Sequence, residues 1–180
     1  MRKLSELEGV SLGIIYKLQP CTAYRVRCVL KDSPSSHWRA SAGSVYPLLT
    51  RLEAENHVSA VIDKGDGRGR KFLTLSNRGL ASLRKWVGDG TQTEMVSAIF
   101  DPIRSRMFFL QVLNADERKL YVDKLIVLME TYLASIIERH EQGKEIEDDF
   151  DRLGAMGAIM GTEARLEWLK VVRKQLTEYK

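Results

Sequence analysis

The 180-residue sequence predicts a mainly α-helical protein that has one β-hairpin and two domains. Through most of the chain, apolar residues recur every three or four positions, as they do on one face of an α-helix. Between residues 58 and 75 they alternate with other residues instead, which is typical of β-strands. The stretch G-D-G-T-Q-T at 88–93 then indicates a short hinge. We therefore expect a first domain over residues 1–88 and a second, all-helical domain over residues 89–180.

The charge of the chain is divided unevenly between its halves. The net charge is +4, but residues 1–90 hold 15 Lys and Arg against 8 Asp and Glu, a net of +7, whereas residues 91–180 hold 13 against 16, a net of −3. This asymmetry indicates a module that binds a polyanion, joined to a domain with another role. No run approaches the roughly 18 apolar residues of a membrane span, and the first 20 residues carry acids, so we expect a cytoplasmic protein without membrane contact.

The cysteines and histidines do not indicate catalytic chemistry. Cys21 and Cys28 are expected at the two ends of one helix, where buried, reduced thiols are favoured over a redox sensor. His37, His57 and His140 are isolated, and we expect His57 to be a polar surface residue. Because no Cys/His cluster or carboxylate pair has catalytic or metal-binding spacing, we expect no enzyme activity, no metal and no cofactor.

Two helices are expected at the start of the first domain. Ser5, followed by Glu8 three residues later, forms a capping box, which predicts a helix from about Ser5 to Leu18. Thr22 is expected to cap a second, short helix.

The central stretch of this domain is a third helix, A-S-A-G-S-V-Y-P-L-L-T-R-L-E-A, at residues 40–54. Its apolar stripe consists of Val45, Leu48, Leu49 and Leu52. Its opposite face consists of Gly43, Tyr46, Pro47, Thr50, Arg51 and Ala54. Small residues on that face let the helix backbone approach another surface, with Tyr46 and Arg51 as flanking donors. Pro47 leaves two starts open, because either Ser41 is the N-cap and the helix is kinked, or Ser44 is the N-cap and Pro47 lies in the first turn.

Either start places serine hydroxyls and free backbone N–H groups at one helix end. Such an end favours an anion such as a phosphate, and the first turn of a recognition helix is the part that meets base edges. The alternative is a capped amphipathic helix that serves only the core.

A basic β-hairpin follows this helix. Its tip, K-G-D-G-R-G-R-K at 64–71, combines flexible backbone with four cations and one acid, which suits contact with phosphates or a minor groove. Ser76 or Asn77 then caps a fourth helix. Three helices followed by a basic hairpin form the winged helix-turn-helix arrangement and favour DNA binding over a purely structural role.

These residues also resemble a known family. The run S-A-G-S-V-Y-P-L-L-T-R-L-E-A-E-N is similar to the PadR-family signature, in which Gly-hydroxyl-apolar-Tyr-Pro opens the recognition helix and Arg-Leu-Glu closes it. His37-Trp38, Ala23-Tyr24 and R-G-R-K-F-L-T-L-S-N-R-G-L are also similar, so the resemblance covers about residues 8–86. Ala23 departs from the family's usual glycine, and Asn56 replaces a common glycine but tolerates the left-handed conformation.

The second domain is expected to consist of helices. Asp101-Pro102 starts a segment whose apolar residues are crowded enough to be buried on most sides, namely Ile103, Met107, Phe108, Leu110, Val112 and Leu113. Asn114 caps the next helix, Ala115 to His140, whose apolar stripe is too wide for a lone helix pair. A second copy of the chain is the economical partner for that surface.

The last helix follows the acidic link E-I-E-D-D-F-D. One side of it is bare backbone at Gly154, Gly157 and Gly161, where we expect a close helix crossing rather than the floor of a ligand pocket. The segment E-A-R-L-E-W-L resembles the end of the PadR-family C-terminal dimerisation domain, particularly in the branch that includes AphA.

Pattern and resemblance together imply a sequence-specific DNA-binding transcriptional regulator, a repressor, that acts as a homodimer on an inverted-repeat operator in double-stranded DNA. The alternative function is a winged-helix module that binds protein and not DNA. The expected DNA-binding residues are Tyr24, Ser41, Ser44, Tyr46, Thr50, Arg51, Arg68, Arg70 and Lys71. The expected dimerisation residues are Leu125, Met129, Tyr132, Ile136, Leu166, Trp168, Leu169 and Val172.

The resemblance further implies that some family members respond to phenolic acids or hydrophobic drugs. A small-molecule effector pocket in this chain would be lined by Trp86, Phe100, Met107 and Phe108, and ordinary core packing is the favoured alternative for these residues.

Overall fold

A computed structural model describes residues 2–32, 42–63, 69–88, 101–142 and 148–178. The chain divides into two compact units, residues 1–99 and 100–180. Because residues 89–100 lie outside the described part, the predicted domain boundary at residue 88 stays a prediction. Each unit is considered separately below.

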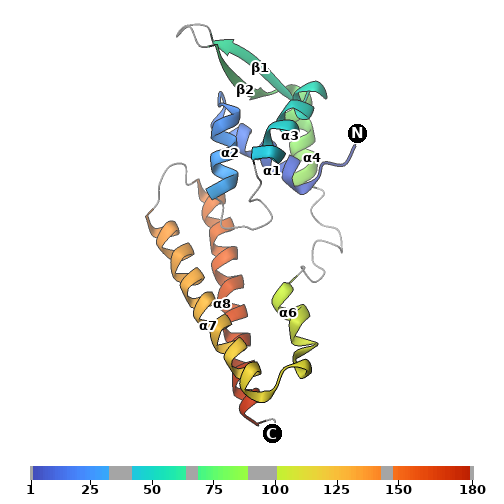
Figure 1. Cartoon of the computed structure of the whole chain (residues 1–180). Coiled ribbons are helices and arrows are strands. Elements are labelled where there is room, and N and C mark those ends of the chain that lie inside the picture. Colours follow the sequence, from blue (N-terminus) through green and yellow to red (C-terminus); the bar gives the residue numbers. More distant parts are fainter. Residues whose placement is uncertain (1, 33–41, 64–68, 89–100, 143–147, 179–180) are drawn as a thin grey trace. The chain divides into compact units, whose positions relative to one another are not determined.

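The described residues of the first unit form four helices and one β-hairpin, which are labelled in Figure 1. Its elements in order are α1 (Glu6–Leu18), α2 (Ala23–Asp32), α3 (Ala42–Ala54), β1 (Val58–Asp63), β2 (Arg70–Leu75) and α4 (Asn77–Gly88). The strands pair antiparallel, with Val58 opposite Leu75 and Asp63 opposite Arg70. This arrangement confirms the predicted three-helix core with a β-hairpin wing.

The core of this unit is formed by apolar residues from one face of each helix and strand. Leu12, Ile15, Val26, Leu30, Val45 and Leu52 have no exposed surface. The predicted stripe of α3 is confirmed, since Leu48 and Leu49 are also buried. Burial of one stripe of α3 leaves its opposite face outside the core.

Local capping follows the sequence closely. The capping box of Ser5 and Glu8 is present, and Thr22 Oγ1 accepts a hydrogen bond from the Arg25 backbone at 3.2 Å. Ser76 Oγ accepts from the backbone N–H of Gly79 at 2.9 Å, so Ser76 and not Asn77 caps α4. Asn56 has φ +59°, which confirms that asparagine takes the left-handed turn after α3.

The start of α3 decides between the two caps left open by Pro47. The helix begins at Ala42, so Pro47 lies inside it and the start at Ser44 is wrong. Ser41 precedes this first residue and lies outside the described residues. A proline at this position removes one backbone donor from the helix ladder.

Two predictions from single residues are corrected. His57 is a buried residue, 5% exposed, because the left-handed turn at Asn56 directs the chain back toward α4, where the Ser82 hydroxyl lies 3.2 Å from His57 Nδ1. Cys21 is not on the helix but pairs with Leu73 through two backbone hydrogen bonds. Burial raises the pKa of the Cys21 thiol, whereas Cys28, on α2, is only half-buried.

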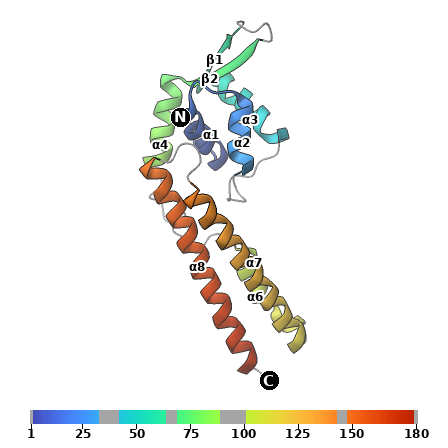
Figure 2. The same ribbon diagram turned by 90° about the vertical axis from the view of Figure 1, so that its left-hand side faces the viewer.

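The second unit consists of helices. Its elements are α6 (Pro102–Met107), the 3₁₀ turn η1 (Leu110–Val112), α7 (Ala115–Glu141) and α8 (Asp149–Glu178). Both views show α7 and α8 side by side along their length (Figures 1 and 2). The predicted caps are confirmed, since Asn114 forms a capping box with Glu117, and Asp101 accepts from the first turn of α6.

The helix pair buries only part of its apolar surface. Met129, Leu166 and Leu169 form its core. The expected burial of the segment after Ile103 is wrong for Phe108 and Val112, which are 72% and 79% exposed. Because α6 has only six residues and the turn after it is also short, this segment does not bury the apolar side chains that face away from the rest of the unit.

The glycine face of α8 has no neighbour within the described residues. A Cβ atom built on Gly154, Gly157 or Gly161 would meet nothing within 4 Å. The close neighbour expected from the sequence is therefore absent from this part of the single chain. Every helix of the described residues is too short or too polar to cross a membrane.

Gly79 of α4 provides a test of the packing in the first unit. A Cβ atom at this position would lie 1.9 Å from the carbonyl oxygen of His57, which is backbone and has no side-chain freedom to move away. We expect Gly79→Ala to lower the free energy of unfolding by about 1–3 kcal/mol, as measured by urea denaturation.

The matched control is Gly13→Ala in α1, where the added Cβ meets nothing within 4 Å. This control should be neutral or stabilise by up to about 1 kcal/mol, since alanine favours a helix. Equal stability of the two variants would contradict the close approach of α4 to His57.

Candidate nucleic-acid interface

The outward face of α3 is formed by small residues and flanked by donors. Gly43, Pro47 and Thr50 are exposed, and Tyr46 and Arg51 stand on either side of them. The Tyr46 side chain is 41% exposed, and that of Arg51 is 54% exposed. Such a face lets the helix axis come close to a flat or grooved partner.

Thr50 has part of its hydrogen-bonding capacity already used. Its hydroxyl donates to the backbone carbonyl of Tyr46 at 3.1 Å. The hydroxyl proton is thereby held inside the helix, and Thr50 offers a partner an acceptor oxygen and a methyl group.

Tyr24 projects from α2 in the same unit. It is 62% exposed, and the guanidinium carbon of Arg27 lies 5.3 Å from its ring centre, within the range of a cation–π contact. The cation stabilises the position of the ring and leaves a phenol available to an acceptor such as a phosphate oxygen.

The wing is linked to α3 by an ion pair. Lys71 Nζ, on β2, donates to Glu53 Oε2 at 2.6 Å. Arg70 is exposed at the start of β2, opposite Asp63. Arg68 and Ser41, two further expected DNA-binding residues, lie outside the described residues.

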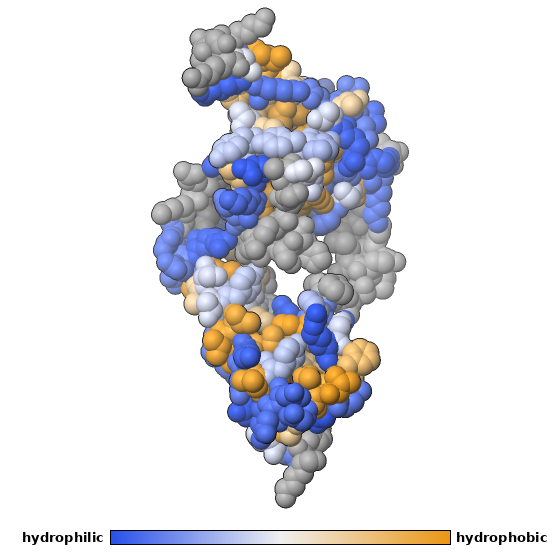
Figure 3. All heavy atoms as spheres, viewed as in Figure 1, coloured by the Kyte–Doolittle hydropathy of each residue, from blue (hydrophilic) through white to orange (hydrophobic). Residues whose placement is uncertain are grey.

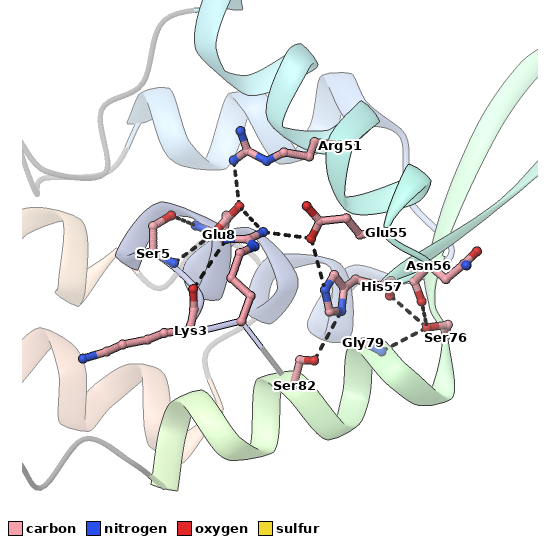
Figure 4. A network of polar contacts seen from close by, with 11 residues as sticks. Lys3, Ser5, Glu8, Arg51, Glu55, Asn56, His57, Ser76, Gly79 and Ser82 are labelled. Atoms are coloured by element: carbon pink, nitrogen blue, oxygen red, sulfur yellow. Dashed lines mark hydrogen bonds and ion pairs between the residues drawn. The ribbon is translucent and has the colours of Figure 1, made fainter.

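A buried carboxylate ties the other flank of α3 to α1 (Figure 4). Glu8 is 1% exposed and accepts from Arg51 Nη2 at 2.7 Å. Nη1 and Nη2 of Arg2 both donate to it at 2.9 Å, and the backbone N–H of Ser5 donates at 2.8 Å. The bonds from Arg2, then those from Ser5 and Arg51, outweigh burial and hold the pKa of Glu8 well below its usual range.

The network continues from this carboxylate to α4. Arg2 also donates to Glu55 Oε2 at 2.8 Å, and that contact lowers the pKa of Glu55. His57 Nε2 lies 3.5 Å from Glu55 Oε2, and the other ring nitrogen of His57 faces the Ser82 hydroxyl. A chain of polar contacts therefore runs from α3 and α1 to Ser82 on α4. Sequence reasoning missed these contacts, because it identified Glu8 only as a capping residue and did not single out Arg2 or Glu55.

The expected dimerisation residues divide between the core and the surface of the second unit. Met129, Ile136, Leu166 and Leu169 are buried within the chain itself. Leu125, Trp168 and Val172 are half-buried, and Tyr132 is 38% exposed. The structure of one chain does not test their role in a dimer, which stays a prediction.

The expected effector residues are placed as follows. Trp86 packs on Gly9, where an added Cβ would lie 2.2 Å from its Cε2 atom. Met107 packs against the core of the second unit, Phe108 is exposed, and Phe100 lies outside the described residues. Core packing accounts for Trp86 and Met107, and the pocket stays a prediction. The described residues hold no group of His, Cys, Asp or Glu that could bind a metal ion.

Three helices, an antiparallel hairpin and a fourth helix define the first unit as a winged helix-turn-helix domain. Its residues 12–85 match the transcriptional regulator PadR-like family, which confirms the predicted resemblance. Members of this family are transcriptional regulators, which supports the prediction that the chain is not an enzyme. Among curated protein sequences, none matches this chain.

Solved structures of similar fold cover both units. Bacillus subtilis PadR in complex with operator DNA has a TM-score of 0.81 at 17% identity, over 96% of this chain and 99% of that chain. The virulence activator AphA of Vibrio cholerae has a TM-score of 0.74 at 18% identity, over 97% and 100%. B. subtilis PadR in complex with p-coumaric acid gives 0.73 at 16% identity, over 97% and 98%. These likenesses confirm the fold class, a winged helix followed by a helical unit, and the predicted likeness to AphA in fold.

Glu8→Gln tests whether the buried carboxylate stabilises the first unit. The substitution leaves Arg2 and Arg51 without their ionised partner, so we expect the free energy of unfolding at pH 7 to fall by about 3 kcal/mol. The folded-state pKa of Glu8 lies below its ordinary value of 4.5, so its ionised form stabilises the fold above about pH 4.5 and this contribution is lost as the pH falls. The difference from wild type should therefore shrink in acid, as measured by urea denaturation from pH 7 to pH 3.

Glu6→Gln is the matched control, because Glu6 lies in the same first turn but is exposed. Its effect should stay within about 1 kcal/mol at all these pH values. A Glu8→Gln variant as stable as wild type at pH 7 would show that the network does not stabilise the fold.

Proposed function

We propose that the chain is a homodimeric repressor of transcription that binds an inverted-repeat operator in double-stranded DNA. The observation that carries this proposal is the pairing of two features in one unit: the small-residue face of α3 and the basic strand beside it. The match of residues 12–85 to the transcriptional regulator PadR-like family supports the role of a DNA-binding transcriptional regulator. Such a protein has to share a compartment with DNA, which fits the expected cytoplasmic location.

In this proposal α3 is the recognition helix. Its 13 residues span about 20 Å, and a major groove about 12 Å wide admits one helix. Gly43, Pro47 and Thr50 let the backbone approach the bases. Ser44 and Tyr46 lie in the first turns, which are the part of a recognition helix that meets base edges.

The wing and α2 supply contacts to the DNA backbone. Arg68, Arg70 and Lys71 are proposed to contact phosphates or the minor groove, and Tyr24 to contact a phosphate. The ion pair from Lys71 to Glu53 fixes β2 against α3, so that helix and wing meet the duplex with a constant spacing.

The helical unit is proposed to form the dimer. On α8, Phe150, Leu153 and Met160 are 77%, 57% and 59% exposed, and on α7 Val127 and Leu128 are 60% and 65% exposed. The space-filling view also shows apolar residues on the surface of the helical unit (Figure 3). Exposed apolar surface of this extent favours a protein partner over solvent. A second copy offers the same surface, and its two-fold symmetry predicts an operator of two inverted half-sites.

The proposal is tested by selecting duplexes from a random pool with the full chain and titrating the selected site by fluorescence anisotropy at two salt concentrations. We expect the selected site to be an inverted repeat bound about 10³-fold or more tightly than a scrambled duplex, with affinity that falls steeply with salt. Failure to bind any duplex at either salt would overturn the proposal and favour a protein-binding module.

A small-molecule effector stays a prediction for this chain. B. subtilis PadR has been solved with p-coumaric acid. Addition of p-coumaric acid to the same titration tests whether an aromatic acid releases this chain from its selected site.

Arg70→Ala tests the role of the wing. Because a phosphate contact carries no sequence information, we expect binding to all duplexes to weaken by a similar factor. The salt slope, that is, the slope of the logarithm of the binding constant against the logarithm of the salt concentration, should become smaller in magnitude by about one. The measurement is anisotropy titration of specific and scrambled duplexes across a salt series.

Arg84→Ala removes the same charge from α4, outside the proposed interface, and should leave the salt slope unchanged. Loss of preference at a single base pair in Arg70→Ala, with an unchanged slope, would contradict a phosphate contact.

Gly157→Leu tests the dimer surface of α8. Leu153, Gly157 and Met160 share one side of the helix, and a side chain at the glycine would hold a partner helix away from the backbone. We expect the dimer dissociation constant to rise about tenfold or more, as measured by sedimentation equilibrium, with the helix content unchanged.

The unchanged fold is expected because a Cβ on Gly157 meets nothing within the described residues of one chain. Glu163→Leu is the control, since it adds the same side chain about 120° away around α8. A dimer equally strong in Gly157→Leu and wild type would exclude this side of α8 from the interface.

A further inference from the structure

The contact between Arg51 and Glu8 supports an inference that rests on the proposed function and adds to it. Arg51 lies beside the outward face of α3, and its side chain is 54% exposed. A guanidinium carries five N–H donors in a planar fork, and the bond to Glu8 at 2.7 Å uses one of them. One terminal nitrogen of Arg51, Nη2, is therefore held by Glu8, while the side chain is still exposed at the surface.

Glu8 is a fixed anchor for this arginine. It is 1% exposed, and three further hydrogen bonds hold its two oxygens, two from Arg2 at 2.9 Å and one from the Ser5 backbone at 2.8 Å. The carboxylate can neither turn toward solvent nor follow Arg51 if that side chain moves. The orientation of the Arg51 fork is thus set by α1 and not by α3 alone.

The charges around Arg51 are balanced. Arg51 and Arg2 both bond Glu8, and Arg2 also bonds Glu55 at 2.8 Å, so two cations alternate with two anions. A compensated arginine adds little to the attraction of phosphates, which depends on net positive charge. The remaining N–H donors of Arg51 keep a fixed orientation, which is needed to form hydrogen bonds with the edge of one particular base.

The base that matches an arginine fork is guanine, because its O6 and N7 atoms present two acceptors side by side in the major groove. We propose that Glu8 is a positioning residue that holds Arg51 in the orientation in which it reads one guanine in each operator half-site. Glu53 and Lys71 form the contrasting pair on the other flank of α3. There the cation is a lysine, a single point charge on a flexible stem, and Glu53 is one-third exposed.

This contrast provides the experiment. Full-length wild type, Arg51→Ala, Arg51→Lys, Glu8→Gln, Glu8→Asp and Glu53→Gln each select duplexes from the same random pool. The affinity for all four base pairs is then measured at every position of the wild-type site, over a salt series. Thermal melting followed by circular dichroism shows which variants are folded.

We expect wild type to prefer G·C at one position of each half-site by about tenfold to hundredfold. Arg51→Ala should lose this preference alone, with the salt slope unchanged, and Arg51→Lys should not restore it because lysine lacks the fork. Both Glu8 variants should weaken the preference at the same position, whereas Glu53→Gln should keep it. Glu8→Asp retains the charge and serves as the test if Glu8→Gln does not fold.

Two results would overturn the inference while the proposed function stands. Equal weakening of all duplexes by Arg51→Ala, with a smaller salt slope, would make Arg51 a phosphate contact. Full preference for G·C in a folded Glu8 variant would show that Glu8 does not position Arg51. Failure of wild type to select any sequence is a separate result, which removes the proposed function and the inference together.

Discussion

The buried carboxylate of Glu8 is the constraint on which the first unit depends. A carboxylate removed from water is costly unless charged and hydrogen-bonded partners replace the water. Here Arg2, Ser5 and Arg51 do so, and they come from the N-terminal segment, the start of α1 and the far part of α3. The same carboxylate that helps to cap the start of α1 also fixes where α3 lies.

Through that constraint, α3 is held on both flanks and left open on its outward face. Glu8 binds Arg51 on one flank, and Lys71 of the wing binds Glu53 on the other. The core stripe that includes Leu52 secures the inner face. A helix held in this way presents its small residues and its donors in one geometry, which a reader of DNA sequence needs, since misplaced donors lose their discrimination.

The second unit follows a different principle. The antiparallel helices α7 and α8 form their own backbone hydrogen bonds and bury Met129, Leu166 and Leu169. They leave several large apolar side chains and the glycine face of α8 exposed. A pair of helices has a small interior for its surface, so a second layer is needed before such residues are removed from water. In the proposed dimer the second copy supplies that layer and sets the two-fold symmetry of the site on DNA.

The sequence by itself determined the features that depend on neighbours a few positions apart. The capping box at Ser5, the cap at Asn114, the apolar stripe of α3, the hairpin and the left-handed turn at Asn56 could all be predicted, because each follows from local backbone geometry or from helix and strand periodicity. The exposure of Phe108 could not be predicted in the same way. The short helix α6 that precedes it and the turn that follows carry apolar residues on several sides, and their spacing does not say which side has a neighbour.

Only the tertiary structure decided the rest of the candidate site. Glu8 and Arg51 are 43 positions apart, and no spacing rule links them. His57 is buried because the turn before it brings it onto α4, so the residue type alone suggested the wrong environment. Periodicity tells which residues share a face, whereas the partner of a buried charge is set by how distant elements pack, and that depends on the whole core at once.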